Sequence, residues 1–374
     1  MGRGDGGGRA TLIRGIAATL VGLGAIMVAP LASAGEASWD DVVKAAIAEG
    51  EVDVHGGPGE VFHHILVDGF REAFPKIKVN FSGLSGRDAI PKMVRERAAG
   101  IYSTDVYVGG SSSLLQSLKP IHAFAPIRPA FILPEVLDDK AWYGGFNGGW
   151  VDRDQEFIFG FEATVTETTA VNRDFVSRDI MNTYDDLLSP KLAGKIVFDD
   201  PRLPGPGLGA AQRYLLNFGE DWLKRLYSEQ KIVYIANPHQ EAEWLVSGKY
   251  PIGIGASADE IARFQQHGLG KNVVSFEAPM PRPTMDFAYG SVALMDHAPH
   301  PNAAKVYINW LLSKAGQSDW GKIGGNSRRI DIPYAVPKLA PQPGITYINE
   351  QTEENLANRQ EAGNLAKKYI PAGP

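Results

Sequence analysis

The loop between a predicted strand and a predicted helix, within residues 185–216, carries the residue types best suited to bind a ligand. Residues 196–198 are an apolar run suited to a central strand, and glycines open a helix from residue 205. Asp200 and Arg202 lie between them. A helix start exposes unpaired backbone N–H groups, which attract anions. We therefore expect Asp200, Arg202 and Gly207 to contact a ligand.

Three further polar loops follow predicted strands of the first half, at 56–59, 82–87 and 109–113. Any one of them is equally typical of a plain turn or a helix cap. Strands of one parallel sheet end at the same edge, so three such loops at one pole favour a shared binding site. The candidate contacts there are the backbone of Gly57, the guanidinium of Arg87 and the hydroxyls of Ser111 and Ser112.

The second half adds three candidates, each with a structural alternative. Ser257 follows a buried strand, and His239 follows another strand and opens a helix. Tyr289 lies on a strand that returns to the first half, where it could stack on a ligand or pack the hinge. Arg202 could instead form a salt bridge with Asp199 or Asp200, and Arg87 could be a solvated loop charge.

Catalytic and metal sites are not predicted. The chain lacks the G-x-S-x-G, H-E-x-x-H and G-x-x-x-x-G-K motifs. His63, His64 and Asp68 have a spacing that places two ligands on one helix face, but without a third ligand a surface group is favoured. His297 and His300 belong to a helix entry, which favours capping. We expect no catalytic residue, no metal and no cofactor.

The elements that position these residues alternate between strands and helices. Strands are expected at 52–55, 77–81 and 105–108, each followed by a loop and a helix, and the second half repeats the construction around 196–198, 232–235 and 252–255. A single helix is expected over 299–317. Repeated units of this kind predict an α/β protein with doubly wound parallel sheets.

The N-terminus indicates export. Residues 1–34 carry three arginines, a mostly apolar run and Ala-Ser-Ala, which predicts a cleaved signal peptide rather than a membrane anchor. Removing three arginines and one aspartate from 37 basic and 43 acidic residues leaves a formal net charge of about −8, which argues against a nucleic-acid partner. The chain has no cysteine, so disulfides and thiolate chemistry are excluded.

Several segments resemble one known family. The chain is similar to the periplasmic solute-binding proteins of ABC importers, in the branch that includes ferric-iron binders. The segments that carry the resemblance are LLSPKLAGKI at 187–196, GKYPIGI at 248–254, APHPNAA at 298–304, NWLLSKAGQ at 309–317 and SRRID at 327–331. The resemblance implies a type II fold, in which two lobes joined by crossing strands close around one solute by hinge motion.

The iron chemistry of that branch does not carry over to this chain. The resemblance implies iron ligands at positions that here read about Gly59, Gly110 and Ala256-Ser257. Phenolate, carboxylate and imidazole groups hold a hard trivalent cation, whereas these positions offer small or hydroxyl side chains. The remaining candidates favour a carboxylate, sulfonate or phosphoryl group.

The predicted protein is thus a non-enzymatic, periplasmic, monomeric binding protein. We expect lobe 1 to comprise residues 35–160 and 285–374, and lobe 2 to comprise 161–284. Its partners would be a small-molecule solute, most simply an organic or phosphoryl anion, and a membrane ABC permease. The alternatives are a ferric-iron transport protein, a secreted hydrolase and a sensor subunit presenting its solute to a receptor.

Overall fold

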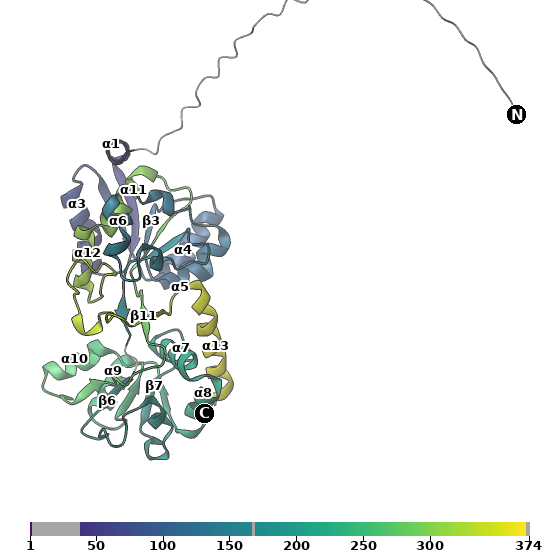
Figure 1. Cartoon of the computed structure of the whole chain (residues 1–374), viewed down its shortest axis with the longest axis vertical. Coiled ribbons are helices and arrows are strands. Elements are labelled where there is room, and N and C mark those ends of the chain that lie inside the picture. Colours follow the sequence, from purple (N-terminus) through teal and green to yellow (C-terminus); the bar gives the residue numbers. More distant parts are fainter. Residues whose placement is uncertain (2–37, 167–168, 372–374) are drawn as a thin grey trace, which may run out of the picture. The chain divides into compact units, whose positions relative to one another are not determined.

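The computed structural model describes Met1 and residues 38–166 and 169–371, so the predicted signal peptide lies outside the described residues. Its first sheet has the strand order β2-β1-β3-β12-β4, and Figure 1 labels β3 of this sheet. The strands are β1 (Glu51–Gly56), β2 (Lys78–Gly83), β3 (Val106–Gly109), β4 (Ile158–Gly160) and β12 (Ser291–Leu294). β1 pairs in parallel with β2 and β3, whereas β12 is antiparallel to β3 and β4. This sheet and its helices are called lobe 1.

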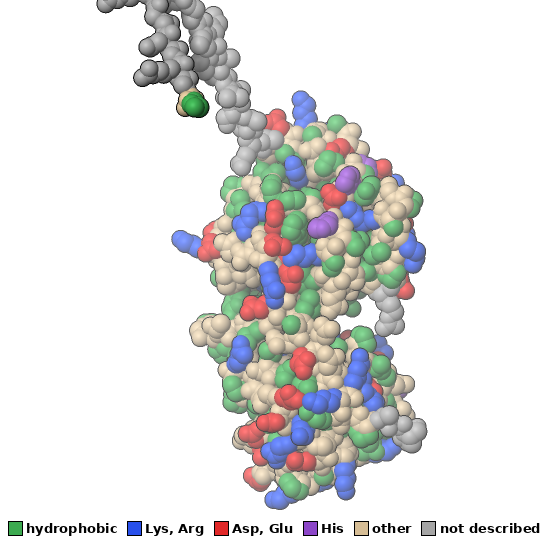
Figure 2. Space-filling view, turned by 90° about the vertical axis from the view of Figure 1, so that its right-hand side faces the viewer, with side chains coloured by type: hydrophobic (Ala, Val, Ile, Leu, Met, Phe, Trp, Pro, Cys, Tyr) green, Lys and Arg blue, Asp and Glu red, His purple; other side chains and the backbone are tan. Residues whose placement is uncertain are grey.

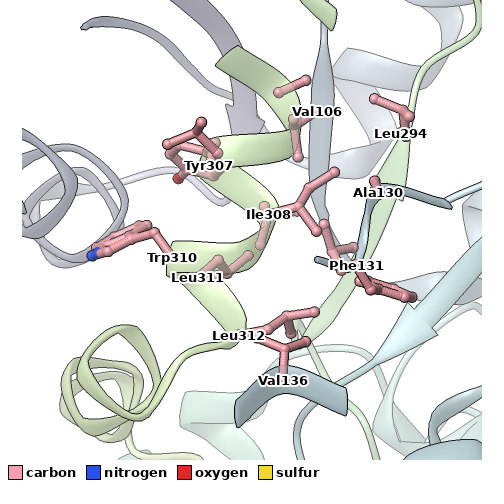
Figure 3. Packing of buried hydrophobic residues seen from close by; sticks show 14 of the residues in the cluster. Val106, Ala130, Phe131, Val136, Leu294, Tyr307, Ile308, Trp310, Leu311 and Leu312 are labelled. Carbon is pink, nitrogen blue, oxygen red and sulfur yellow. The ribbon is translucent and has the colours of Figure 1, made fainter. Parts of the chain in front are cut away.

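Several helices accompany the sheet of lobe 1. These helices are α1 (Trp39–Glu49), α2 (Glu60–His63), α3 (Gly69–Ala73), α4 (Gly86–Ala98), α5 (Ser111–Ser113), α6 (Pro134–Leu137), α11 (Pro301–Leu312) and α12 (Lys314–Trp320). Figure 3 shows Ile308 pointing from α11 toward Val106 and Leu294 of the sheet, and all three side chains are buried. Burying one such aliphatic side chain stabilises the fold by roughly 1.5–3 kcal/mol.

The helix expected over 299–317 is two helices. Ser313 lies between α11 and α12 with an extended backbone, and its hydroxyl accepts a hydrogen bond from the Gly316 N–H at 3.2 Å. Serine competes well with the helix backbone for hydrogen bonds, so it favours a new start over continuation.

The second sheet has the order β10-β6-β9-β7-β8 and defines lobe 2. Its strands are β6 (Thr169–Asn172), β7 (Ile196–Asp199), β8 (Val233–Ile235), β9 (Ile252–Ile254) and β10 (Val273–Ser275). β7 is parallel to β8 and β9, and β6 is antiparallel to β9 and β10. The accompanying helices are α7 (Pro206–Phe218), α8 (Glu220–Glu229), α9 (Pro238–Val246) and α10 (Ala258–Gln266).

A small third sheet forms the hinge, where Figure 1 shows β11 between the two lobes. β11 (Thr284–Asp286) pairs antiparallel with β5 (Thr164–Val165) and parallel with β13 (Ile348–Asn349). The sequence predicts the strand that returns to lobe 1 but not β13, which is only two residues long.

The C-terminal helix departs from the expected domain division. α13 (Glu353–Tyr369) packs on α7 and α8 of lobe 2, although residues 285–374 are expected in lobe 1. Ala362, Leu365 and Ala366 are buried in the lobe 2 core. A stripe of small and aliphatic residues identifies a buried helix face but not its partner, which explains the difference.

Acidic and basic side chains are interspersed over the face seen in Figure 2. No helix among the described residues is long and apolar enough to cross a membrane.

Candidate functional site

A pocket of about 270 Å³ opens in lobe 1 at the carboxyl ends of β1, β2 and β3. All three predicted polar loops line it: Gly57 and Pro58 follow β1, Ser85 and Gly86 follow β2, and Gly110 follows β3. The parallel sheet brings these strand ends to one edge, as the sequence predicts. Larger hollows of about 390 Å³ exist elsewhere on the described surface, but they do not gather the loops at this sheet edge.

His55 and Tyr107 form the inner wall of this pocket. The two rings stack with centroids 4.5 Å apart, and His55 is only 2% exposed. Its Nδ1 has no hydrogen-bond partner among the described residues. Burial, assisted by the charge of Lys92 and opposed by the Ser82 carbonyl, lowers the pKa of His55 to about 4. The imidazole is therefore neutral at neutral pH.

Tyr107 stays a phenol under the same conditions. Burial and the nearby Tyr289 raise the pKa of Tyr107 to about 12. A neutral phenol can donate one hydrogen bond and accept others, so this wall offers neutral polar groups to a solute.

Tyr289 lines the outer part of the pocket, where the sequence places a ligand contact. Its side chain is 54% exposed, and its ring meets that of Phe62 edge-on with centroids 5.4 Å apart. Both roles expected for Tyr289 are thus compatible with its position.

The start of α4 faces the same pocket through Ser85 and Gly86. The Ser85 hydroxyl donates to the Asp88 carboxylate at 2.6 Å instead of capping the helix. The Gly86 N–H has no hydrogen-bond partner among the described residues. Arg87 is the second residue of α4, and its side chain lies outside the description.

The loop after β3 uses its serines differently from the expectation. Ser111 is buried, and its hydroxyl donates to the Gln351 carbonyl at 3.0 Å, so it does not line the pocket. Ser112 is half-buried and does not line it either. Ser113 does, which residue type alone could not distinguish within a run of three serines.

The charged loop of lobe 2 is held by its own residues. The Asp200 carboxylate accepts two hydrogen bonds from the Arg202 guanidinium, at 2.8 and 2.7 Å, which is the internal salt bridge considered as the alternative. Arg202 also donates to the Pro371 carbonyl at 3.1 Å. Burial opposes ionisation of Asp200, but these bonds prevail and lower its pKa.

The anion-binding capacity expected at the start of α7 is already used. The Gly207 N–H donates to the Asp199 carboxylate at 2.7 Å. A side-chain anion of the same chain therefore occupies the position where a ligand anion was expected. Sequence separation alone cannot show that an eight-residue return brings Asp199 back to this helix start.

The other two lobe 2 candidates join α9 to α10. His239 lies 2.9 Å from Glu260 and stacks on Phe264 with ring centroids 5.3 Å apart. Ser257 caps α10 by accepting the Glu260 N–H at 3.3 Å. Their observed contacts are thus structural.

One group of described residues has ligand atoms close enough for a metal: Asp53, Asp105 and His300, within 4.8 Å of one another. It lies away from the pocket, because Asp105 precedes β3 whereas the pocket follows it. The sequence favours a capping role for His300, but its side chain does not cap the helix. Instead, its Nδ1 lies 2.9 Å from the Asp105 carboxylate. Burial opposes protonation of His300, yet Asp105, Asp53 and Glu51 raise its pKa overall. These carboxylates thus favour the protonated form of the imidazole.

Buried acids are the main feature that the sequence did not indicate. Glu162 and Glu241 are 2% and 1% exposed, and the half-buried Asp286 follows them in chain order at the end of β11. Acidic residues are normally found at the surface, so nothing in the pattern distinguishes these three from the other acids.

The amino-acid sequence is similar to one protein family and to one known bacterial protein. A sequence profile described as "Bacterial extracellular solute-binding protein" matches residues 66–327. A Haemophilus influenzae protein described as uncharacterized is 22% identical over 353 residues, which cover 92% of this chain and 94% of that protein.

Solved structures resemble the chain at lower identity. A Trichodesmium protein (IdiA, FutA) in complex with iron and citrate ligands is 18% identical, with a TM-score of 0.64 and coverage of 86% of this chain and 99% of that one. Ferric iron-binding protein A of Mannheimia haemolytica, in an open conformation, is 14% identical, with a TM-score of 0.66 and coverage of 85% and 98%. A putative extracellular solute-binding protein of Bordetella parapertussis is 14% identical, with a TM-score of 0.65 and coverage of 87% and 100%. These likenesses confirm the predicted two-lobed α/β fold.

Proposed function

This chain belongs to the family of bacterial extracellular solute-binding proteins, and we propose that it captures a small solute in the lobe 1 pocket and delivers it to a membrane ABC permease. The observation that carries the proposal is the convergence of three strand-end loops on one pocket whose wall holds a buried imidazole with no described hydrogen-bond partner at its Nδ1. Ligands of open α/β sheets bind beyond the carboxyl ends of the strands. The protein acts in the periplasm as a monomer without turnover.

The solute is an organic or phosphoryl anion. No acidic side chain lines the pocket among the described residues, whereas Ser113, Tyr107 and the start of α4 offer hydrogen-bond donors. Donors that converge on one point favour an oxyanion. The charge of Lys92, which reaches His55, adds to the positive potential.

Iron is the second candidate, because solved structures of similar fold hold iron or are named for it. The pocket does contain one imidazole and two phenols, from His55, Tyr107 and Tyr289. Tyrosine binds ferric iron as a phenolate, however, and burial, which raises the pKa of Tyr107 to about 12, opposes the deprotonation that such binding needs. The positions at which the resemblance implies iron ligands, about Gly59, Gly110 and Ala256-Ser257, also lack imidazole, carboxylate and phenol groups. The pocket therefore suits an anion better than ferric iron.

A thermal-shift screen tests the proposal on purified protein lacking residues 1–34. The ligands are carboxylates, phosphonates, sugar phosphates, quaternary amines and ferric salts. A solute at a hundredfold excess over its Kd stabilises the folded state by about 2.7 kcal/mol, so the Tm should rise by several degrees for an anion.

Two neighbouring serines provide a matched pair of variants. Ser113→Ala removes a hydroxyl from the pocket and should weaken binding of the anion by roughly 3–10-fold, since one hydrogen bond contributes about 1 kcal/mol. Ser112→Ala, outside the pocket, should leave affinity unchanged. A Tm shift with ferric salts alone contradicts the anion assignment, and consumption of the solute contradicts a binding protein.

A further inference from the structure

The turn that carries Tyr289 to the pocket comes directly from the hinge. β11 ends at Asp286, the chain turns through residues 287–290, and β12 begins at Ser291 in the lobe 1 sheet. The Gly290 N–H closes the turn by donating to the Phe287 carbonyl at 2.6 Å. Ala288 has φ of +41°, which is unusual for a residue with a side chain. Such a turn needs support from its surroundings.

Asp286 supports the beginning of this turn. Its carboxylate accepts hydrogen bonds from the Ala288 N–H and from the Gln351 side chain. Gln351 in turn accepts the Ser111 hydroxyl at its carbonyl, 3.0 Å away, which links the turn to the loop after β3. The strained residue, Ala288, is thus held by the Asp286 carboxylate.

Glu162 supports the end of the turn. It lies between β4 and β5 and packs so tightly that a Cβ atom added at Gly290 would lie 2.3 Å from the Glu162 Cβ. A Cβ added at Gly325, on the other side, would lie 2.3 Å from its Oε1. The Glu162 side chain is therefore enclosed between the backbones of Gly290 and Gly325, and neither position has room for a larger residue without a shift.

Glu162 is also hydrogen-bonded to Trp320, which belongs to a row of aromatic rings that ends at Tyr289. Its Oε1 accepts the Thr164 hydroxyl at 3.0 Å, and its Oε2 accepts the Trp320 indole N–H at 3.2 Å. Trp320 packs edge-on against Phe62 with ring centroids 6.2 Å apart, and Phe62 packs against Tyr289. One buried carboxyl group thus touches both the backbone of the turn and the ring chain behind Tyr289.

No described cation neutralises Glu162. The charged group that faces Glu162 from β11 is the Asp286 carboxylate. The charges of Arg213 and Arg359 act on Asp286. The charged groups of the surrounding segments have other partners. Glu350 pairs with Arg213, and Lys322 pairs with Asp319 at 2.7 Å. Arg328 donates to backbone carbonyls, including that of Gly160. Burial first, and then the charge of Asp286, raise the pKa of Glu162 to about 8.

We propose that Glu162 is a positioning residue for the solute pocket: its neutral carboxyl group holds the 287–290 turn and Trp320 in place, and its ionisation loosens the turn and moves Tyr289. This deepens the proposed function, because the turn lines the pocket assigned to the solute. An ionised carboxylate here would have only neutral donors, from Thr164, Trp320 and the Gly290 backbone, and a like charge nearby, which favours any arrangement that admits water.

Hydrogen–deuterium exchange of the solute-free protein tests the positioning without reference to any ligand. Exchange of peptides covering residues 284–294 is followed from pH 6 to 9.5 and divided by the intrinsic rate at each pH. Between pH 6 and pH 8 the corrected rate should rise about tenfold per pH unit and then level off, because the water-accessible open state is already ionised in that range whereas the closed state ionises only above about pH 8. Glu162→Gln, which is isosteric and neutral, should give a flat profile.

Two further variants make the outcome specific. Glu277→Gln removes an exposed carboxylate in lobe 2 and should behave as wild type. Trp320→Phe removes one of the two side-chain donors to the carboxylate and should move the pH at which the rate levels off to a higher value. A flat wild-type profile, or the same rise in Glu162→Gln, overturns the proposal. Failure of every solute in the thermal-shift screen would instead refute the proposed function alone.

Discussion

Replacing Glu241 by glutamine should stabilise the protein at neutral and alkaline pH. Glu241 lies on α9, is 1% exposed, and its Oε1 has no hydrogen-bond partner among the described residues. Burial and the neighbouring Asp199 charge raise its pKa from the ordinary value of 4.5 to about 9, against the effect of the Asp199 backbone N–H. The folded protein therefore binds this proton more tightly than the unfolded chain.

The sign and size of the effect follow from proton linkage. Because the folded-state pKa is raised, the contribution of Glu241 to stability is fully present below pH 4.5 and is lost as the pH rises from 4.5 to about 9. Each pH unit in that window removes about 1.4 kcal/mol, so roughly 3 kcal/mol is lost by pH 7. Glutamine does not titrate and should avoid that loss.

Thermal unfolding followed by circular dichroism between pH 5 and pH 9 measures the effect. The Tm of Glu241→Gln should match that of wild type near pH 5 and exceed it at pH 7 by roughly 6–12 °C. Glu243→Gln, at an exposed position on the same helix, is the matched control and should follow wild type throughout. A constant difference between Glu241→Gln and wild type at every pH would refute the reasoning, because it would show no change in proton uptake.

Substitutions at His55 and at two glycines, Gly207 and Gly363, have equally defined outcomes. His55 is buried with its pKa lowered to about 4, so the folded state binds fewer protons than the unfolded chain and stability should fall by roughly 3 kcal/mol as the pH drops from 6.5 to 4. His55→Gln should remove that acid sensitivity in Tm measurements, and an unchanged acid limb would argue against a neutral buried imidazole. Gly207→Ala places a Cβ atom 1.8 Å from the Asp199 carbonyl oxygen and should destabilise lobe 2 by about 3 kcal/mol in urea unfolding. Gly363→Ala, in α13 with its first neighbour at 3.4 Å, should instead gain about 0.5–1 kcal/mol, and equal effects of the two substitutions would contradict the steric argument.

Local pattern was sufficient where a residue's neighbours in sequence decide its environment. Apolar runs such as 196–198 and 252–254 could only be buried strands in a chain of alternating strands and helices, and both occupy the lobe 2 sheet. Gly50 ends its helix with φ of +81°, which favours glycine there. The meeting of three strand-end loops followed from the parallel arrangement itself.

Pattern was insufficient wherever two distant segments compete for the same group. The serine run after β3 was recognised as polar, but only the approach of Gln351 decides that Ser111 is used internally while Ser113 lines the pocket. Likewise the start of α7 is a sound anion site in isolation, and the return of Asp199 fills it.

The sequence by itself determined the fold class, the pole at which the pocket forms and most of the loops that line it, because hydrophobic periodicity and turn residues act over short distances. The tertiary structure alone decided which polar groups remain free to meet a solute. It also decided where α13 docks and that Glu162 and Glu241 are buried without a cation, since burial and electrostatic compensation depend on segments far apart in the chain.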